Sequence, residues 1–425
     1  MKTKMTPTSA LTEFDPPLTK SGIQTENPDQ TQRTRNQVPK TTIPWFSFHR
    51  KALGVMLAFT LFGYVCDALA QEQVTHVNNL TVLKIQNPEE DVDFVSAKPM
   101  PLPINDSPED TTQSMIRALL STPPLGTPGY APGAEGTGKT SPVFLGTPEA
   151  AESGVTSEDF GTNNHPFTTA RADLYGLNTN KAYPYRAAGK LFFKIGTSSF
   201  ICSASLIKRG IVVTAAHCVA NYGQKQFYSG WQFVPGYRNG SAPFGTWTAK
   251  QVWIKSAYYN GTDACAVFGV VCPDDVAVII LNTQSGAYPG TAAGWFGYWY
   301  GGGFTSNGLT HITQLGYPGG LDNAADMERN DSQGYINSSD SNNTVIGSNM
   351  NGGSSGGPWI ANFGLPSVLT GETNGSFSPP NVVVGVTSWG YTATGPKEQG
   401  ASPFTSNNIQ SLLTSACGAT PAACN

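Results

Sequence analysis

Charged residues are scarce in this chain of 425 residues. Only 13% are Asp, Glu, Lys or Arg, and the formal net charge is −4. Such a balance creates no global basic field, so we expect no nucleic-acid partner. Charge this sparse also argues against a coiled coil or a helical bundle, and no repeat of fixed period runs through the sequence.

Patterns that bind metal ions are missing as well. The seven cysteines form no C-x-x-C pair, and no two of the five histidines stand at the spacing of zinc ligands. Structural and catalytic zinc sites depend on such spacings. We therefore expect neither a metal ion nor an organic cofactor.

The chain also lacks an apolar run of comfortable membrane-spanning length. The run Ala52 to Cys66 has fifteen residues, whereas a spanning helix needs about 20. It follows the basic triplet His49-Arg50-Lys51 and precedes Ala68-Leu69-Ala70, the order found in a secretory signal peptide. We expect residues 1–70 to be a leader with a signal, and the remainder to be secreted, extracellular or periplasmic, with no stable membrane span. The alternative is an anchor formed by an uncleaved segment 52–70.

Glycine and proline, by contrast, are plentiful, with 47 and 31 residues. Residues 71–165 are rich in Pro, Gly and Thr and carry thirteen acidic against four basic residues. Such a composition predicts a largely irregular segment, either a propeptide that covers or chaperones the next region or a linker. Two islands are exceptions: Val82 to Ile85 resembles a strand, and Ser114 to Leu120 a short helix.

From about residue 184 the sequence consists of short β-branched and aromatic runs between turns. Examples are "FICSASLI", "IVVTAA", "VAVIIL" and "VVVGVTSW". This alternation predicts an all-β domain over residues 166–425, built as an antiparallel sandwich or barrel. Only the stretch near 405–416 is typical of a helix.

The hexapeptide Gly353 to Pro358 is the first candidate for chemistry. Flanking glycines allow a tight turn, and such a turn can aim consecutive N–H groups at one point. Ser355 would be a nucleophile, with an oxyanion hole formed by the N–H groups of Gly353 and Ser355. Taken alone, a Gly/Ser string more often forms a loop or linker.

A histidine and an aspartate complete the candidate site. His217 follows an apolar strand, and Asp275 immediately precedes another. A carboxylate at the start of an apolar strand needs a hydrogen-bond partner, and an imidazole N–H is a suitable one. We expect Asp275 to take this role and its neighbour Asp274 to face solvent.

Six cysteines remain once Cys66 is lost with the signal. An even number in a secreted chain implies disulfides, and six cysteines allow fifteen pairings. The gaps along the sequence suggest three bonds: Cys202–Cys218, Cys265–Cys272 and Cys417–Cys424.

Four motifs in order, "TAAHC", "DDVAV", "GGSSGGP" and "SWG", resemble those of trypsin-like serine proteases of the chymotrypsin fold. The most similar branch is the bacterial one that includes the glutamyl endopeptidases. The resemblance implies two antiparallel six-stranded β-barrels with a short C-terminal helix. It also implies that Ser388 supports the aspartate and that Ser388, Trp389 and Gly390 form an edge on which substrate pairs in antiparallel fashion.

Two departures from that family concern activation. No Ile-Val-Gly-Gly-like start is visible near residues 166–190, and Ser354 stands where the family has an aspartate that receives the new N-terminus. The usual buried ion pair therefore cannot form. We expect activation to consist of removing segment 71–165.

The primary specificity pocket is predicted by counting from Ser355. The resemblance places Asn349 at its base, with Met350 beside it and Gly390 and Gly400 along walls open to a sizeable side chain. Thr387 stands where glutamate-directed members have a histidine. This pocket would be neutral and partly apolar, which favours large neutral residues and weak cleavage after Lys, Arg or Glu.

Alternative readings use the same residues. The pattern G-x-S-x-G also fits an α/β-hydrolase, but that fold needs a histidine after its serine, and all five histidines precede Ser355. A catalytically inactive binding module on the protease fold remains the alternative. The prediction is a monomeric serine endopeptidase, made as a precursor, that contacts its own pro-segment and cleaves proteins or peptides through an acyl-enzyme.

Overall fold

The computed structural model describes a large part of the chain, all within one compact unit, Asp67–Asn425. The described residues are 73–86, 88, 91–105, 129–147, 159–161, 166–173, 176–265, 267–301, 309–336, 344–364, 379–391 and 397–425. The expected signal segment and the expected helix Ser114 to Leu120 lie outside them. Within these ranges, no helix has both the length and the apolar character needed to cross a membrane.

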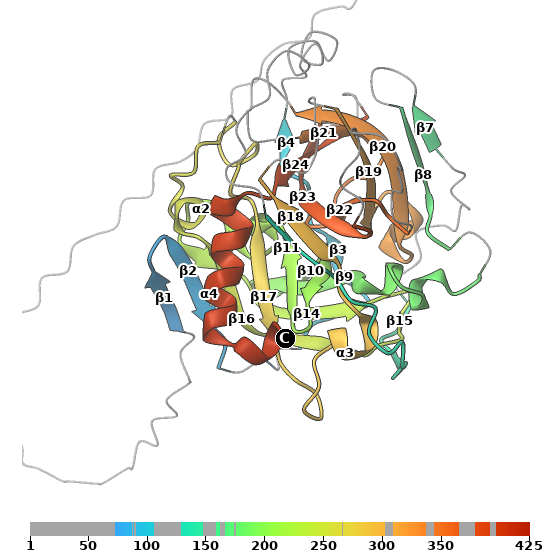
Figure 1. Ribbon diagram of the computed structural model, residues 1–425, viewed down its shortest axis with the longest axis horizontal. Coiled ribbons are helices and arrows are strands. Elements are labelled where there is room, and N and C mark those ends of the chain that lie inside the picture. Colours follow the sequence, from blue (N-terminus) through green and yellow to red (C-terminus); the bar gives the residue numbers. More distant parts are fainter. Residues whose placement is uncertain are drawn as a thin grey trace, which may run out of the picture. The chain divides into compact units, whose positions relative to one another are not determined.

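Six antiparallel strands close into a first barrel (Figure 1). They are β9 (Ala188–Ile195), β10 (Ser198–Lys208), β11 (Ile211–Thr214), β14 (Ser229–Pro235), β16 (Trp247–Lys255) and β17 (Ala277–Leu281). The barrel closes because β16 pairs with both β14 and β17. The apolar runs predicted as strands supply β10, β11 and β17, and every residue of β17 is buried.

A second barrel follows in the chain and also has six antiparallel strands. They are β19 (Leu309–Gly316), β20 (Glu328–Ile336), β21 (Thr344–Gly347), β22 (Pro358–Ala361), β23 (Val382–Tyr391) and β24 (Glu398–Pro403). Pairing between β19 and β20 closes it. Two six-stranded antiparallel barrels are the architecture that the sequence motifs implied.

Helices are few and short among the described residues. The α-helices are α2 (Ser256–Asn260), α3 (Gly290–Ala293) and α4 (Ser411–Ala419). A π-helical turn, Ser406–Gln410, leads into α4 and begins with a capping box in which Thr405 and Asn408 bind each other's backbone N–H. This is the C-terminal helix predicted near 405–416, and α4 lies beside β16 and β17 (Figure 1).

Shorter strands lie outside the two barrels. They are β1 (Gln73–Val77), β2 (Leu80–Lys84), β3 (Lys98–Pro99), β4 (Ile104–Asn105), β5 (Gly129–Ala131), β6 (Val143–Phe144), β7 (Asp159–Gly161), β8 (Phe167–Arg171), β12 (Ala220–Asn221), β13 (Gln226–Phe227), β15 (Ser241–Ala242) and β18 (Gly297–Tyr300). Most of those before residue 166 have two or three residues, as expected for a largely irregular segment.

The first hairpin of that segment nevertheless extends the sheet of the first barrel. Strand β2, which overlaps the predicted strand island at Val82 to Lys84, pairs with β16 along residues 80–84. The side chains of Leu80, Val82 and Leu83 are buried in the barrel cores. Segment 71–165 therefore contributes more apolar burial than its composition suggested.

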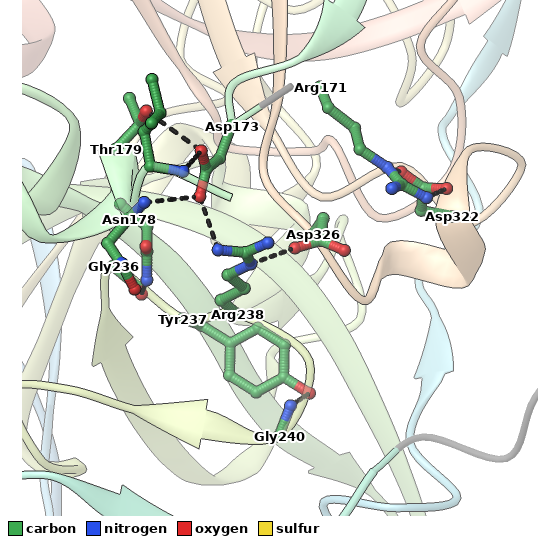
Figure 2. A network of polar contacts seen from close by, with 12 residues as sticks. Arg171, Asp173, Asn178, Thr179, Gly236, Tyr237, Arg238, Gly240, Asp322 and Asp326 are labelled. Carbon is green, nitrogen blue, oxygen red and sulfur yellow. Dashed lines mark hydrogen bonds and ion pairs between the residues drawn. The ribbon is translucent and has the colours of Figure 1, made fainter. Parts of the chain in front are cut away.

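An ionic network ties the start of the expected protease domain to the body of the fold (Figure 2). The Arg238 guanidinium binds Asp173 and Asp326, and Asp173 also accepts the backbone N–H groups of Leu177 and Asn178. Arg171 pairs with the carboxylate of Asp322. Each arginine thus joins the region before β9 to another loop.

Three disulfides are present and pair as the sequence gaps suggested. They are Cys202–Cys218, Cys265–Cys272 and Cys417–Cys424. The first joins β10 to the turn that follows β11, and the second closes the loop that precedes β17.

Candidate active site

His217 lies on a short 3₁₀ turn, Ala216–Cys218, immediately after β11. The disulfide from Cys218 to Cys202 on β10 holds this turn against the barrel, with the two Cα atoms 6.3 Å apart. The turn is buried, and only 5% of His217 is exposed. Strand and disulfide therefore fix the position of the imidazole.

Asp275 binds both the ring and the backbone of His217. Its Oδ2 lies 2.8 Å from His217 Nδ1, and its Oδ1 accepts the His217 backbone N–H at 2.8 Å. The hydroxyl of Ser388 on β23 donates to the same Oδ2 at 2.5 Å. An ionised carboxylate can only accept hydrogen bonds, so the ring must donate an N–H from Nδ1. The imidazole proton is therefore on Nδ1, and Nε2 is left as an acceptor.

Asp274 does not face solvent, so that expectation was wrong. Only 5% of the residue is exposed. Burial raises the pKa of its carboxyl, and the nearby Lys255 acts in the opposite direction. Its backbone N–H donates to Asp263 Oδ2, and burial together with Asp274 raises the pKa of Asp263 to about 7. The loop around Cys265–Cys272 thus holds a buried carboxyl, Asp274, next to a partly buried one, Asp263.

Ser355 stands in a tight turn that presses against the first barrel. The Ser355 carbonyl accepts the N–H of Ser203 at 2.7 Å. Gly356 has φ +75°, and a Cβ there would lie 2.0 Å from Thr214 Oγ1, so only glycine fits this close approach. The turn therefore brings the serine from the second barrel to the strand that carries His217.

The hydroxyl of Ser355 and the Nε2 of His217 are both buried, and neither makes a hydrogen bond. Ser355 itself is fully buried. The structure thus joins His217, Asp275 and Ser388 directly, whereas Ser355 contributes a hydroxyl that is not bonded to the ring.

The N–H of Gly353, predicted for the oxyanion hole, is occupied. It donates to the carbonyl of Met100 at 2.9 Å. Gly353 has φ +94° and would place a Cβ 2.5 Å from the carbonyl oxygen of Tyr317. Its carbonyl accepts the hydroxyl of Ser203 at 2.9 Å.

A neutral hydrogen-bond network surrounds Ser354, which the family pattern would replace with an aspartate. The Ser354 hydroxyl donates to the Asn351 carbonyl at 2.6 Å and accepts from Gln399 Nε2 at 3.1 Å. The same Nε2 donates to the Met350 carbonyl at 2.9 Å. Gln399 is buried and accepts from Gln314. Sequence reasoning missed both glutamines because nothing in their local sequence pairs them with this loop.

The expected pocket residues form two groups. Asn349 is partly exposed, and its Oδ1 accepts from the ammonium of Lys397 at 2.8 Å; Met350 is buried beside it. Counting from Ser355 could not place Lys397, which comes 42 positions later in the chain. The candidate pocket base therefore has a cation next to it that the sequence prediction lacked.

Gly400 acts as a packing position for Trp389. A Cβ at residue 400 would lie 2.1 Å from the indole of Trp389, which is fully buried. At Gly390 the nearest atom to such a Cβ would be Leu102 Cδ1, at 3.4 Å. Of the two glycines, Gly390 is thus the one that borders the segment around Met100.

Two groups of His, Cys, Asp or Glu side chains have the compactness of a metal site among the described residues. They are Cys202, His217 and Cys218, and Asp263, Cys265 and Cys272. Both include the two cysteines of a disulfide. Their sulfurs are bonded to each other and do not offer the thiolates that a metal ion needs.

Comparison with known proteins gives a family and several relatives. The family model described as Trypsin matches residues 177–409, more than half of the chain. The "Extracellular metalloprotease" of Bacillus subtilis is 28% identical over 174 residues, which are 39% of this chain and 47% of that protein. The "Glutamyl endopeptidase" of Bacillus licheniformis is 27% identical over 252 residues, 56% of this chain and 72% of that protein. The chain thus spans about half the length of the first of these relatives.

Solved structures also match. "Protease Anisep" from Arthrobacter nicotinovorans is 26% identical, with a TM-score of 0.44, and the match covers 55% of this chain and 96% of that one. A structure of "Glu endopeptidase in complex with MPD" is 20% identical, with a TM-score of 0.42, covering 59% and 96%.

Proposed function

Because the chain belongs to the trypsin family, we propose that it is a secreted serine endopeptidase with Ser355, His217 and Asp275 as its catalytic triad. The observation that carries this proposal is the geometry at Asp275. Its two oxygens bind the ring and the backbone of His217, and Ser388 supports it. A buried carboxylate held in this way orients an imidazole to act as a base.

In the proposed reaction, Ser355 Oγ attacks the carbonyl carbon of the scissile bond while His217 Nε2 takes the serine proton. Asp275 stabilises the imidazolium that results and keeps the ring in place. The N–H groups of Gly353 and Ser355 stabilise the oxyanion, and one such donor typically contributes about 3–4 kcal/mol. His217 then protonates the leaving amine, and water hydrolyses the acyl-enzyme.

The proposed precursor has three parts. Residues 1–70 are the leader with a signal, residues 71–165 the pro-segment, and residues 166–425 the protease domain. The contacts of Met100 with Gly353 support a role for the segment at the site. We propose no metal or organic cofactor. The cysteine sulfurs of both compact ligand groups are bonded in disulfides, which argues against a metal ion at these two places.

For specificity, we propose that the pocket lined by Asn349 and Met350 takes large neutral side chains, with substrate paired in antiparallel fashion on Ser388, Trp389 and Gly390. The Lys397 ammonium beside Asn349 opposes the entry of Lys or Arg by charge repulsion. Since Lys397 is exposed, solvent screens its charge, and the effect on rate is moderate.

Replacing the nucleophile tests the function. Ser355→Ala should leave a folded, secreted chain and lower the peptidase rate by several orders of magnitude, because deleting such a nucleophile removes most of the triad's contribution. The rate is measured on casein after processing, and a serine-directed phosphonate should label the wild type but not Ser355→Ala. Ser354→Ala is not a suitable control because Gln399 binds it, so the exposed Ser285→Ala serves instead.

The same experiment decides between the protease and a catalytically inactive binding module. A module would take up no phosphonate and would hydrolyse no peptide in either form. If Ser355→Ala kept more than about a tenth of the wild-type rate, far above the residual activity of such deletions, the assignment of Ser355 would be wrong.

A further inference from the structure

Residues 98–105 of the expected pro-segment run from the first barrel to the second along the candidate active site. At one end, β3 pairs with β10 through Lys98 opposite Phe200. At the other end, β4 pairs with β23 through Ile104 opposite Gly390. Both pairings are parallel. The segment therefore keeps one direction along the site, from β10 to β23.

Backbone hydrogen bonds fix the segment between its ends. Met100 donates its N–H to the Ile201 carbonyl and accepts the N–H of Gly353, both at 2.9 Å. The Pro103 carbonyl accepts the N–H of Gly390 at 3.0 Å. These partners are a strand of the first barrel, the candidate oxyanion hole and the candidate substrate edge. The segment thus contacts the groups that a substrate would use.

We propose that this cleft binds an extended peptide in the direction opposite to a substrate, and that residues 98–105 of the chain are that peptide. The inference rests on the proposed function, in which substrate pairs with β23 in antiparallel fashion. A substrate would then run from β23 past the oxyanion hole toward β10. The segment runs from β10 past the oxyanion hole toward β23, with the Met100 carbonyl at Gly353.

Reversal accounts for how a peptide can occupy the oxyanion hole without being cut. In a substrate, the nitrogen that follows the attacked carbonyl lies on the β10 side, where His217 would protonate it. In the segment, the nitrogen that follows the Met100 carbonyl belongs to Pro101 and leads toward β23. His217 is therefore on the wrong side of the Met100–Pro101 bond to protonate its leaving group, and the bond persists.

The sequence of the segment suits this mode of binding. Pro99, Pro101 and Pro103 alternate with Met100 and Leu102. Each proline fixes φ near −65° and removes an N–H, so the free segment is already extended and loses little conformational entropy on binding. Between the paired ends β3 and β4, the backbone groups that bind the cleft are those of Met100 and the Pro103 carbonyl.

Engineered disulfides in the full chain test the direction in which residues 98–105 run through the cleft. In a Ser355→Ala background, the pairs Lys98→Cys with Phe200→Cys and Ile104→Cys with Gly390→Cys join residues that the parallel registers place opposite each other. Neighbouring strands are close enough for such a bond. The exchanged pairs, 98 with 390 and 104 with 200, are matched controls that would bond only in a segment running as a substrate does.

We expect both parallel pairs to cross-link and both exchanged pairs to remain reduced, as read by peptide mapping of the folded monomer. Cross-linking of the exchanged pairs, or of no pair, would overturn the proposal. The two parallel pairs are independent, so misfolding of one variant leaves the other as a test.

A second measurement keeps Ser355 and asks whether the locked segment blocks it. The Lys98→Cys, Phe200→Cys precursor should react with phosphonate at least about tenfold more slowly when oxidised than after mild reduction, because the bond holds the covered state. Equal rates would contradict inhibition by the segment. If the processed wild type hydrolyses casein but the cross-links fail, only this inference falls. If the cross-links form but nothing is hydrolysed, the proposed function falls.

Discussion

Lys397 is the residue whose contact most changes the expected specificity. Its ammonium binds Asn349 Oδ1, so replacing it with an acid reverses the charge beside the pocket base. Lys397→Glu should raise kcat/KM for substrates with Lys or Arg before the cut by about fivefold, the range of an exposed ion pair near 1 kcal/mol. Rates on peptides that differ only at this residue measure the effect.

Lys225→Glu makes the same charge change at an exposed lysine in the turn between β12 and β13, outside the two barrels. This control should leave unchanged the ratio of kcat/KM for peptides with Lys or Arg before the cut to kcat/KM for peptides with a neutral residue there. If Lys397→Glu kept the wild-type preference, neither Lys397 nor Asn349, which it binds, would belong to the specificity pocket.

Glu328 is the residue through which stability should depend on pH. Burial, followed by the neighbouring Asp322, raises the pKa of its carboxyl from 4.5 to about 9. The folded state then holds a proton that the unfolded state releases, so this contribution is complete below pH 4.5 and is lost as pH rises toward 9. Glu328→Gln keeps the shape of the protonated acid and should remove that slope.

The difference in free energy of unfolding between Glu328→Gln and wild type should grow with pH, by at most about 1.4 kcal/mol per pH unit. Urea titrations at several pH values between 5 and 9 measure it. The exposed Glu135→Gln is the matched control and should follow the wild type. A difference that stays constant across this range would show that Glu328 does not carry the proton.

At the scale of single residues, the motifs predicted more than the composition did. Asp275 binds both His217 and Ser388, and each of the three was found because its neighbours in the chain form a recognisable pattern. Gln399 and Lys397 have no such neighbours. Their roles arise from strand pairing and loop return, which bring together positions that sequence spacing does not relate.

At the scale of elements, the hairpin β1–β2 offers a test of how firmly the pro-segment belongs to the fold. Leu83 lies in β2 and is buried in the core of the first barrel. Leu83→Ala should lower the free energy of unfolding of the precursor by about 2–5 kcal/mol through lost burial and a cavity.

Val74→Ala in the adjacent strand β1 is the matched control, because 40% of Val74 is exposed. It should change the free energy of unfolding by less than about 0.5 kcal/mol. Both are measured by urea unfolding of the full chain. If the two substitutions changed the free energy of unfolding equally, the β1–β2 hairpin would not unfold together with the first barrel.

The barrel strands could be predicted as strands because their apolar runs are buried on both faces, as in β17. The part played by β2 could not. Its five residues carry the same signal as any short strand, and only the pairing with β16 reveals that an acidic, proline-rich segment adds a strand to the sheet of the first barrel. Composition averages over such a segment and hides its few buried positions.

At the scale of the whole molecule, the covalent attachment of this segment makes activity depend on protein concentration. If residues 98–105 cover the cleft as proposed, the intact chain holds them there at the high effective concentration of a tethered ligand. Once the chain is cut between residues 147 and 166, the same contacts with β10, β16 and β23 become those of a separate inhibitor. The fraction of enzyme bound to the released segment then depends on the concentration of both.

The specific activity of freshly cut protein should therefore rise as the solution is diluted from about 1 μM to about 1 nM, because dilution favours dissociation. Continuous assays at each concentration measure this rise. A specific activity independent of concentration would mean that cutting alone empties the cleft. If it does rise, then the secreted enzyme that we propose would stay inactive near the cell, where its concentration is high, and would gain activity as it diffuses away.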